Sequence, residues 1–126
     1  QQDSAGVQVF PLENPAVTEL LADASAAESN GQYEQASMLL ERALRIQPRN
    51  PEILQSMAGL NLRMADYEQA LNFASRSYDV GPRVGEICSR NWRTIAVSRE
   101  YLGDHSGSGE AEGRARSCMV TKPEGF

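Results

Sequence analysis

A tetrapeptide, YEQA, occurs twice in this chain with a fixed spacing. It covers residues 33–36 and returns 34 positions later at residues 67–70. The prolines Pro48 and Pro82 keep the same offset. A fixed period of this length indicates a structural unit that is repeated along the chain, each copy burying its apolar face against its neighbours. The period therefore constrains the fold more than any single motif does.

Each copy has the pattern of a helical hairpin. The first apolar stripe follows the i, i+3, i+4, i+7 spacing of one buried helix face, at Val17, Leu20, Leu21 and Ala24. Gly31 suits the left-handed turn after a helix end. A second amphipathic run over residues 36–46 stops before Pro48. The second copy repeats this order over residues 53–82.

A third copy is altered. The turn at Gly103 lies 38 positions after the equivalent Ala65, so about four extra residues lie near residues 83–90. The segment after Gly103 contains three glycines and little apolar material. Because glycine inside a helix costs roughly 1 kcal/mol relative to alanine, we expect the last helix to be short, late-starting or frayed.

The repeated positions resemble the tetratricopeptide repeat family. The first copy keeps Gly31, Tyr33, Ala36, Leu40, Ala43 and Pro48, and the second keeps Tyr67, Ala70, Ala74 and Pro82. The resemblance implies an all-α fold of helical hairpins stacked as a short right-handed superhelix, with two full repeats plus a degenerate third. We expect an extended arm over residues 1–15, the repeat domain over residues 16–119 and a tail over residues 120–126.

Catalytic and cofactor-binding motifs are not found in the sequence. The formal net charge of −5 argues against a nucleic-acid binder, and no apolar run approaches the ~18 residues of a membrane span. His105 is the only histidine and lies in a polar, glycine-rich segment without paired ligands. That segment lacks the GKS or GKT ending of a phosphate loop. We therefore predict a protein that is not an enzyme, with no cofactor, no metal and no small-molecule substrate.

The two cysteines are placed symmetrically in the third copy. Cys88 lies 15 residues before Gly103 and Cys118 lies 15 residues after it. In an antiparallel hairpin, residues equally far from the turn face each other, so a disulfide is expected at the open end of this hairpin. The alternative is two ordinary core cysteines in a reducing cytosol. A disulfide would imply an oxidising compartment such as the periplasm.

The family's repeat geometry implies a concave groove lined by the first helix of each unit. Carried over by position, its candidate partner-binding residues are Leu21, Gln55, Gly59, Leu62, Arg63, Arg90, Arg93, Val97 and Tyr101. The three arginines could hold carboxylates of a partner, or they could be solvated or paired with Glu52, Glu86 or Glu100. Leu21 and Ser25 stand where the clamp for a chaperone's C-terminal EEVD would need Lys and Asn.

Two segments, ALRIQPRNP at residues 43–51 and SRNWRTIAVSREYLGD at residues 89–104, resemble small periplasmic tetratricopeptide lipoproteins of Gram-negative bacteria. These include the activators of a bifunctional peptidoglycan synthase. The resemblance implies a protein-binding regulator whose partner is a class A penicillin-binding protein. It also implies a periplasmic protein tethered to the outer membrane through a lipid anchor upstream of this chain, with residues 1–15 as the linker. The alternative is a scaffold for assembly of a secretion or type IV pilus system.

Overall fold

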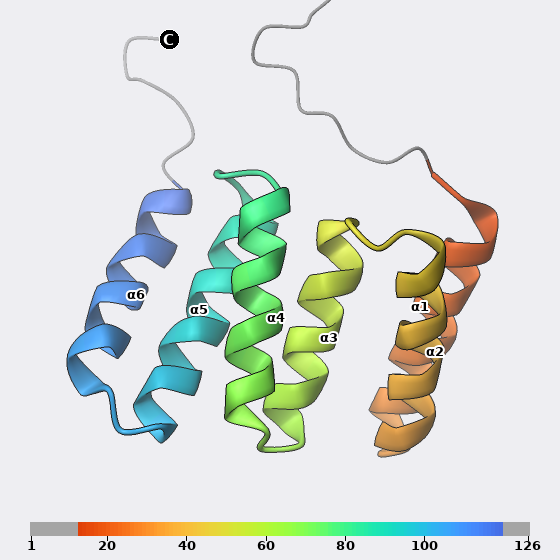
Figure 1. Cartoon of the computed structure of the whole chain (residues 1–126), viewed down its shortest axis with the longest axis horizontal. Helices are drawn as coiled ribbons and strands as arrows, with labels where there is room; N and C mark the ends of the chain where they lie inside the picture. The colour runs from red at the N-terminus through yellow and green to blue at the C-terminus, as the bar shows by residue number, and fades with distance from the viewer. Residues whose placement is uncertain (1–12, 120–126) are drawn as a thin grey trace, which may run out of the picture.

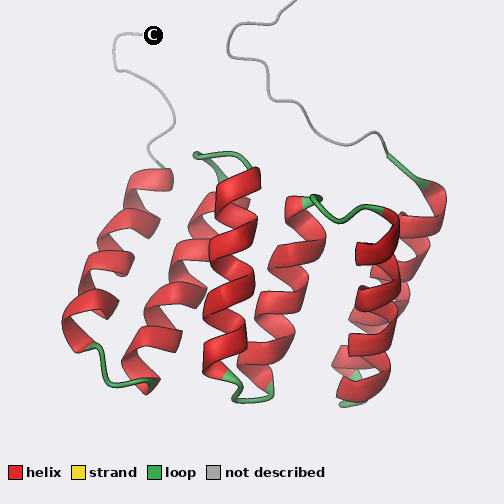
Figure 2. Cartoon of the chain, viewed as in Figure 1, coloured by secondary structure: helices red, strands yellow, loops and turns green. Residues whose placement is uncertain are grey.

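The computed structural model describes residues 13–119 and consists, in that range, of helices joined by short turns (Figure 2). The helices are α1 (Pro15–Ser29), α2 (Tyr33–Ile46), α3 (Pro51–Arg63), α4 (Tyr67–Val80), α5 (Glu86–Tyr101) and α6 (His105–Cys118). Consecutive helices pair as three hairpins that stand side by side (Figure 1). The all-α prediction is confirmed. No described helix is long and apolar enough to cross a membrane.

The division into an arm, a repeat domain and a tail stays a prediction. The first helix begins at Pro15, one residue before the predicted start of the repeat domain. Residues 1–12 of the predicted arm and the predicted tail at 120–126 lie outside the described residues.

The starts of the helices are set by local polar contacts. The side-chain oxygen of Asn14 accepts the Ala16 N–H at 2.9 Å, and that of Asn50 accepts the Glu52 N–H at 2.9 Å. Each asparagine is followed by a proline at the first helical position, where the missing N–H costs nothing. The turn after α1 has Gly31 at φ 76°, the left-handed conformation predicted for this glycine.

The core is built from small and branched side chains contributed by adjacent hairpins. One cluster joins α1, α2 and α3 through buried residues that include Leu40, Met57 and Leu60. A second joins α3, α4, α5 and α6 around Ile95, with Trp92 packed against it. The fold therefore holds together by contacts between neighbouring repeats, as expected for a stacked array.

The YEQA segments begin the second helix of their hairpins. Tyr33 and Tyr67 are the first residues of α2 and α4 and are half-buried. Ala36 and Ala70 are fully buried, so their small side chains let the paired helices approach closely. The repeated tetrapeptide is a structural element of each hairpin.

The third hairpin and the connection before it together have four more residues than the second hairpin and its connection, the number that the sequence predicted. The connection before α5 spans residues 81–85, compared with 47–50 before α3, and α5 has 16 residues compared with 13 in α3. One extra residue therefore lies in the connection and three lie in the helix.

The prediction of a short or frayed last helix was wrong. Helix α6 has 14 residues, as many as α2 and α4. The Asp104 carboxylate caps its start by accepting the Gly107 N–H at 2.9 Å. Ala111 and Ala115 are buried along its length, and Cys118 ties its end to α5. Tertiary contacts thus outweigh the low helix propensity of its glycines.

A buried polar chain fixes the junction of α3, α4 and α5. The Ser77 hydroxyl donates to the Pro51 carbonyl at 2.8 Å, and the Asn91 amide donates to Ser77 Oγ at 2.8 Å. Both polar side chains are fully buried. These directional bonds fix how the second and third hairpins are placed relative to each other.

Candidate functional site

The predicted groove residues lie on α1, α3 and α5, the first helices of the three hairpins. Four of the nine line one cavity of about 210 Å³, which is lined by residues of α1, α2, α3 and α5. They are Leu21 from α1, Gln55 and Gly59 from α3, and Arg90 from α5. The structure therefore brings together residues that are up to 69 positions apart in the chain, from Leu21 to Arg90.

A larger cavity of about 570 Å³ continues from this one toward the open end of the first hairpin. Val17 and Leu21 of α1 supply apolar surface, and Glu52 and Ile87 line it from the α3 and α5 sides. Leu21 borders both cavities. The two cavities adjoin at Leu21, and we call them together the hollow of the groove side.

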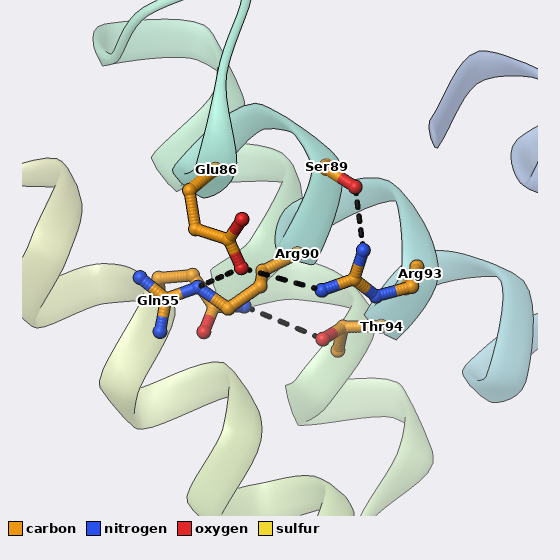
Figure 3. Close-up of polar contacts among 6 residues, drawn as sticks. All are labelled: Gln55, Glu86, Ser89, Arg90, Arg93 and Thr94. Atoms are coloured by element: carbon orange, nitrogen blue, oxygen red, sulfur yellow. Dashed lines mark hydrogen bonds and ion pairs between the residues drawn. The ribbon is translucent and has the colours of Figure 1, made fainter. Parts of the chain in front are cut away.

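Gln55 differs from the other predicted groove residues because its side chain is only 6% exposed. Its amide donates to Thr94 Oγ1 at 3.3 Å, and so links α3 to α5 (Figure 3). A partner that used this amide would have to break a buried hydrogen bond, which is costly. Gln55 therefore stabilises the lining of the cavity by linking α3 to α5.

The groove arginines are engaged with carboxylates of the same chain. Arg90 Nε lies 3.9 Å and Arg93 Nη2 lies 3.6 Å from Glu86 Oε2, and Arg93 also donates to Ser89 Oγ at 2.6 Å (Figure 3). Of the alternatives left open by the sequence, pairing with Glu86 is the one found. Ion pairs this exposed contribute only about 0–1 kcal/mol each, so a partner's carboxylate could replace Glu86 at small cost.

Arg63 is paired in the same way. Its Nε lies 2.9 Å from Glu28 Oε2, which joins the end of α3 to the end of α1. All three arginines singled out from the sequence therefore have an acidic neighbour within the chain. Glu28 also lines the smaller cavity, so this pair borders the hollow at its turn end.

The turn end of the groove side is apolar and aromatic. Val97 is 40% exposed and Tyr101 is 66% exposed, and Leu62 is half-buried on α3. The Tyr101 ring stacks on that of Tyr67 with centroids 4.4 Å apart and planes 2° apart. The sequence identified Tyr67 only as a repeated position and did not predict that it supports an exposed aromatic surface.

The disulfide prediction is confirmed. Cys88 and Cys118 are bonded, with Cα atoms 5.7 Å apart. The Gly85 N–H donates to the Cys118 carbonyl at 2.8 Å, which adds a second link between the start of α5 and the end of α6. The open end of the last hairpin is therefore closed.

Metal-binding side chains do not gather in the described part of the chain. Between residues 13 and 119, no group of three or more His, Cys, Asp or Glu side chains could hold a metal ion. His105 is the first residue of α6, and its Nδ1 lies 2.9 Å from Glu100 Oε2 at the surface. This exposed pair caps a turn.

Comparisons with known proteins agree with this architecture. A family model described as tetratricopeptide repeat matches residues 27–77. The globular C-terminal domain of P. aeruginosa LpoP is 31% identical, with a TM-score of 0.78, and the match covers 82% of this chain and 98% of that domain. The chain belongs to the tetratricopeptide repeat family. No curated protein matches it.

Other tetratricopeptide structures share the fold. The Sgt2 domain from Aspergillus fumigatus is 26% identical, with a TM-score of 0.76, over 83% of this chain and 67% of that one. The second repeat domain of Spaghetti (RPAP3), solved with the HSP90 peptide SRMEEVD, is 14% identical over 82% of this chain and 92% of that one, with a TM-score of 0.75. At that identity the likeness concerns the fold alone. Members of this family act as protein-binding modules, and this chain has the same stacked hairpins.

Proposed function

We propose that this chain is a non-enzymatic regulator that binds and activates a bifunctional peptidoglycan synthase, a class A penicillin-binding protein. The observation that carries the proposal is the likeness to the globular domain of P. aeruginosa LpoP, which spans 98% of that domain at 31% identity. The sequence resemblance to periplasmic lipoprotein activators supports the same class of partner.

The disulfide supports a periplasmic location for this function. Cys88 and Cys118 are both buried and bonded to each other, and such bonds persist in oxidising compartments and are rare in the cytosol. A lipid anchor upstream of this chain, joined through residues 1–15, would hold the domain at the outer membrane. This location would leave the groove facing the periplasmic space in which the synthase acts.

The groove offers a partner both charge and apolar surface. An acidic side chain of the synthase would replace Glu86 beside Arg90 and Arg93, gaining bidentate hydrogen bonds from the two guanidinium groups. Val97 and Tyr101 would cover an apolar side chain next to it, since aromatic anchors often dominate binding energy. The partner would thus be an acidic segment with an apolar residue nearby.

The test combines the purified chain with a purified class A penicillin-binding protein and measures the rate of glycan-strand polymerisation. The chain should raise that rate. The variant Arg90→Glu with Arg93→Glu should weaken binding by about ten-fold or more, because it places repulsive charge where a carboxylate would bind. The matched control is Arg42→Glu with Arg45→Glu on α2, which makes the same charge change at other exposed positions. Circular dichroism would verify that both variants remain folded.

Two results would contradict the proposal. One is a synthase rate that does not respond to the wild-type chain. The other is a pull-down from periplasmic extract that recovers a secretin or pilin and no cell-wall synthase, which would favour the scaffold alternative. If the groove variant and the α2 control bound equally well, the synthase would dock on another surface of the domain.

A further inference from the structure

A cluster of arginines and aromatic rings lies where α4, α5 and α6 meet, away from the groove. We call it the arginine–aromatic cluster, and it consists of Tyr78, Arg83, Trp92 and Arg114. Tyr78 lies on α4, Trp92 on α5 and Arg114 on α6, and Arg83 lies in the connection between α4 and α5. Figure 1 shows these three helices side by side at the C-terminal end of the array.

The rings hold both guanidinium groups in place. The guanidinium carbon of Arg83 lies 4.1 Å from the centre of the Tyr78 ring, and that of Arg114 lies 4.3 Å from the centre of the Trp92 ring. Arg114 Nη2 also donates to the Tyr78 hydroxyl at 3.3 Å. The two rings meet edge to face at 5.1 Å. Each guanidinium carbon thus lies over an aromatic ring, and a guanidinium group held in this way still has N–H donors for a ligand.

Within the described residues, these guanidinium groups form no ion pair with a carboxylate. Across residues 13–119, the ion pairs occupy Arg63, Arg90 and Arg93, and no carboxylate oxygen lies within 4.0 Å of Arg83 or Arg114. Both side chains are exposed. The arginines on the groove side thus form ion pairs, whereas Arg83 and Arg114 form none with any residue that the structure describes.

The phenol of Tyr78 responds to the same positive charge. Burial raises its pKa, but hydrogen bonds from Arg114 and Arg83 and their charges outweigh burial, so the pKa of Tyr78 falls below its ordinary value of 10.0. The acidic residues nearest in sequence to the cluster are all exposed, and within residues 13–119 none forms an ion pair with it: Asp79, Glu86, Glu110 and Glu112. The junction is therefore a locally cationic site.

We propose that the arginine–aromatic cluster is a second docking site, which binds a short acidic segment of a partner protein. Arg83 and Arg114 would each donate edge N–H groups to a carboxylate, and the exposed part of the Trp92 ring would cover the peptide between them. Both guanidinium carbons lie near one ring, 4.1 and 5.9 Å from the centre of Tyr78, so two neighbouring acidic side chains of one segment can reach both.

A short segment fits better than an extended anionic surface. The whole chain has a formal net charge of −5, which repels membranes and nucleic acids at long range. A local contact with two carboxylates avoids most of that repulsion because it involves only the cluster. The site is separate from the groove, and its existence does not depend on a synthase being the groove's partner.

Trp92 is the only tryptophan of the chain and reports directly on this site. Titration with a capped peptide of glutamate and glycine should change Trp92 fluorescence emission in a saturable way. A carboxylate bound to Arg114 would change the position of its guanidinium group over the Trp92 ring. The same peptide with glutamine in place of glutamate should cause no change. A response to both peptides alike, or to neither, would overturn the proposal.

Variants measured by the anisotropy of a labelled glutamate peptide test the residues without relying on Trp92. Arg83→Gln with Arg114→Gln should raise the Kd by about ten-fold or more, and the matched control Arg42→Gln with Arg45→Gln should leave it unchanged. Circular dichroism verifies folding. Arg83→Lys with Arg114→Lys keeps the charge and should still weaken binding, because lysine lacks the planar fork. Unchanged binding in the lysine variant would show that only positive charge is needed, and it would refute the proposed site.

Two further probes test whether the anionic ligand of the cluster is a protein segment, a lipid surface or peptidoglycan. Vesicles of phosphatidylglycerol and soluble peptidoglycan fragments are titrated in the same anisotropy assay, as competitors of the labelled peptide. Unlabelled glutamate peptide is the reference competitor. At the concentration at which it displaces the labelled peptide, we expect neither the vesicles nor the peptidoglycan fragments to displace the labelled peptide. Displacement by either one at a lower concentration would overturn the assignment to a protein segment in favour of that surface.

Discussion

Reduction of the Cys88–Cys118 disulfide tests how the last hairpin is stabilised. The bond joins residues 30 positions apart, and in the chain-entropy model a loop of that length lowers the entropy of the unfolded chain enough to stabilise the fold by about 3.6 kcal/mol. We expect the free energy of unfolding to fall by about that amount when the bond is reduced. Reduction leaves both sulfur atoms in place, so no cavity contributes to the change.

Besides the disulfide, helix α6 is held by the Asp104 cap and by packing of small side chains on α5. Its buried side chains are all small: Ser108, Ala111, Ala115 and Cys118. Gly109 and Gly113 lie in its interior, and each costs about 1 kcal/mol relative to alanine. The disulfide's stabilisation of about 3.6 kcal/mol is thus of the same order as the combined cost of these two glycines, about 2 kcal/mol, together with the weak apolar packing of small side chains.

The assay is urea denaturation followed by circular dichroism, with and without a phosphine reductant. The variant Cys88→Ala with Cys118→Ala should show a similar loss and no response to the reductant. Because repeat arrays do not always unfold in one step, hydrogen exchange of the α6 amides gives a direct second measurement. Protection in α6 should fall on reduction while protection in α3 is largely kept.

A loss below about 1 kcal/mol, with unchanged exchange in α6, would refute this reasoning. It would mean that the packing of α6 on α5 and the Asp104 cap are sufficient to hold the helix. The explanation given above for why the glycine-rich segment forms a full-length helix would then be wrong.

Three further perturbations have defined outcomes. Gly81→Ala should destabilise the fold by roughly 1–3 kcal/mol in urea denaturation, because the added Cβ would lie 2.7 Å from the Cβ of Pro51; an unchanged midpoint would show that the junction can shift. Gly109→Ala and Gly113→Ala should each stabilise by about 0.5–1 kcal/mol, since no atom lies within 4 Å of a Cβ at Gly109 and the nearest atom to one at Gly113 is Arg116 Nη2 at 3.7 Å; destabilisation would contradict this. Because the pKa of Tyr78 is lower in the folded state than its ordinary value, ionisation of this phenol stabilises the fold. The stabilisation is complete above pH 10.0, the ordinary value, and is lost as the pH falls through the lowered pKa. Phenolate absorbance should show one tyrosine titrating early, and later in the double glutamine variant of the arginine–aromatic cluster; identical titrations would contradict the assigned cause.

The hairpin architecture could be predicted because it is set by spacing. Tyr33 and Tyr67 had to occupy equivalent places once the period of 34 was recognised, and they do begin α2 and α4. The disulfide followed from the same kind of argument, since Cys88 and Cys118 are equally far from the turn at Gly103. Positions along a repeat fix backbone geometry, which is what these predictions required.

The details of the sites could not be predicted in the same way. Whether Arg90 pairs with Glu86 or faces an open groove depends on side-chain rotamers that spacing does not determine. The contact between Tyr78 and Arg114 joins residues 36 positions apart, and it exists only because the third hairpin is complete. The sequence suggested that this hairpin would be partly formed, so the arginine–aromatic cluster had no signal from which it could be found.

The closure of the last hairpin also has a mechanical consequence. A pulling force applied at Met119 passes through Cys118 into Cys88 near the start of α5, so α6 cannot be peeled away from the array by itself. The first hairpin has no such covalent tie across its open end in the described part of the chain. Under tension, the domain should therefore unravel from α1, and the cluster at the junction of α4, α5 and α6 should be among the last parts to lose its shape.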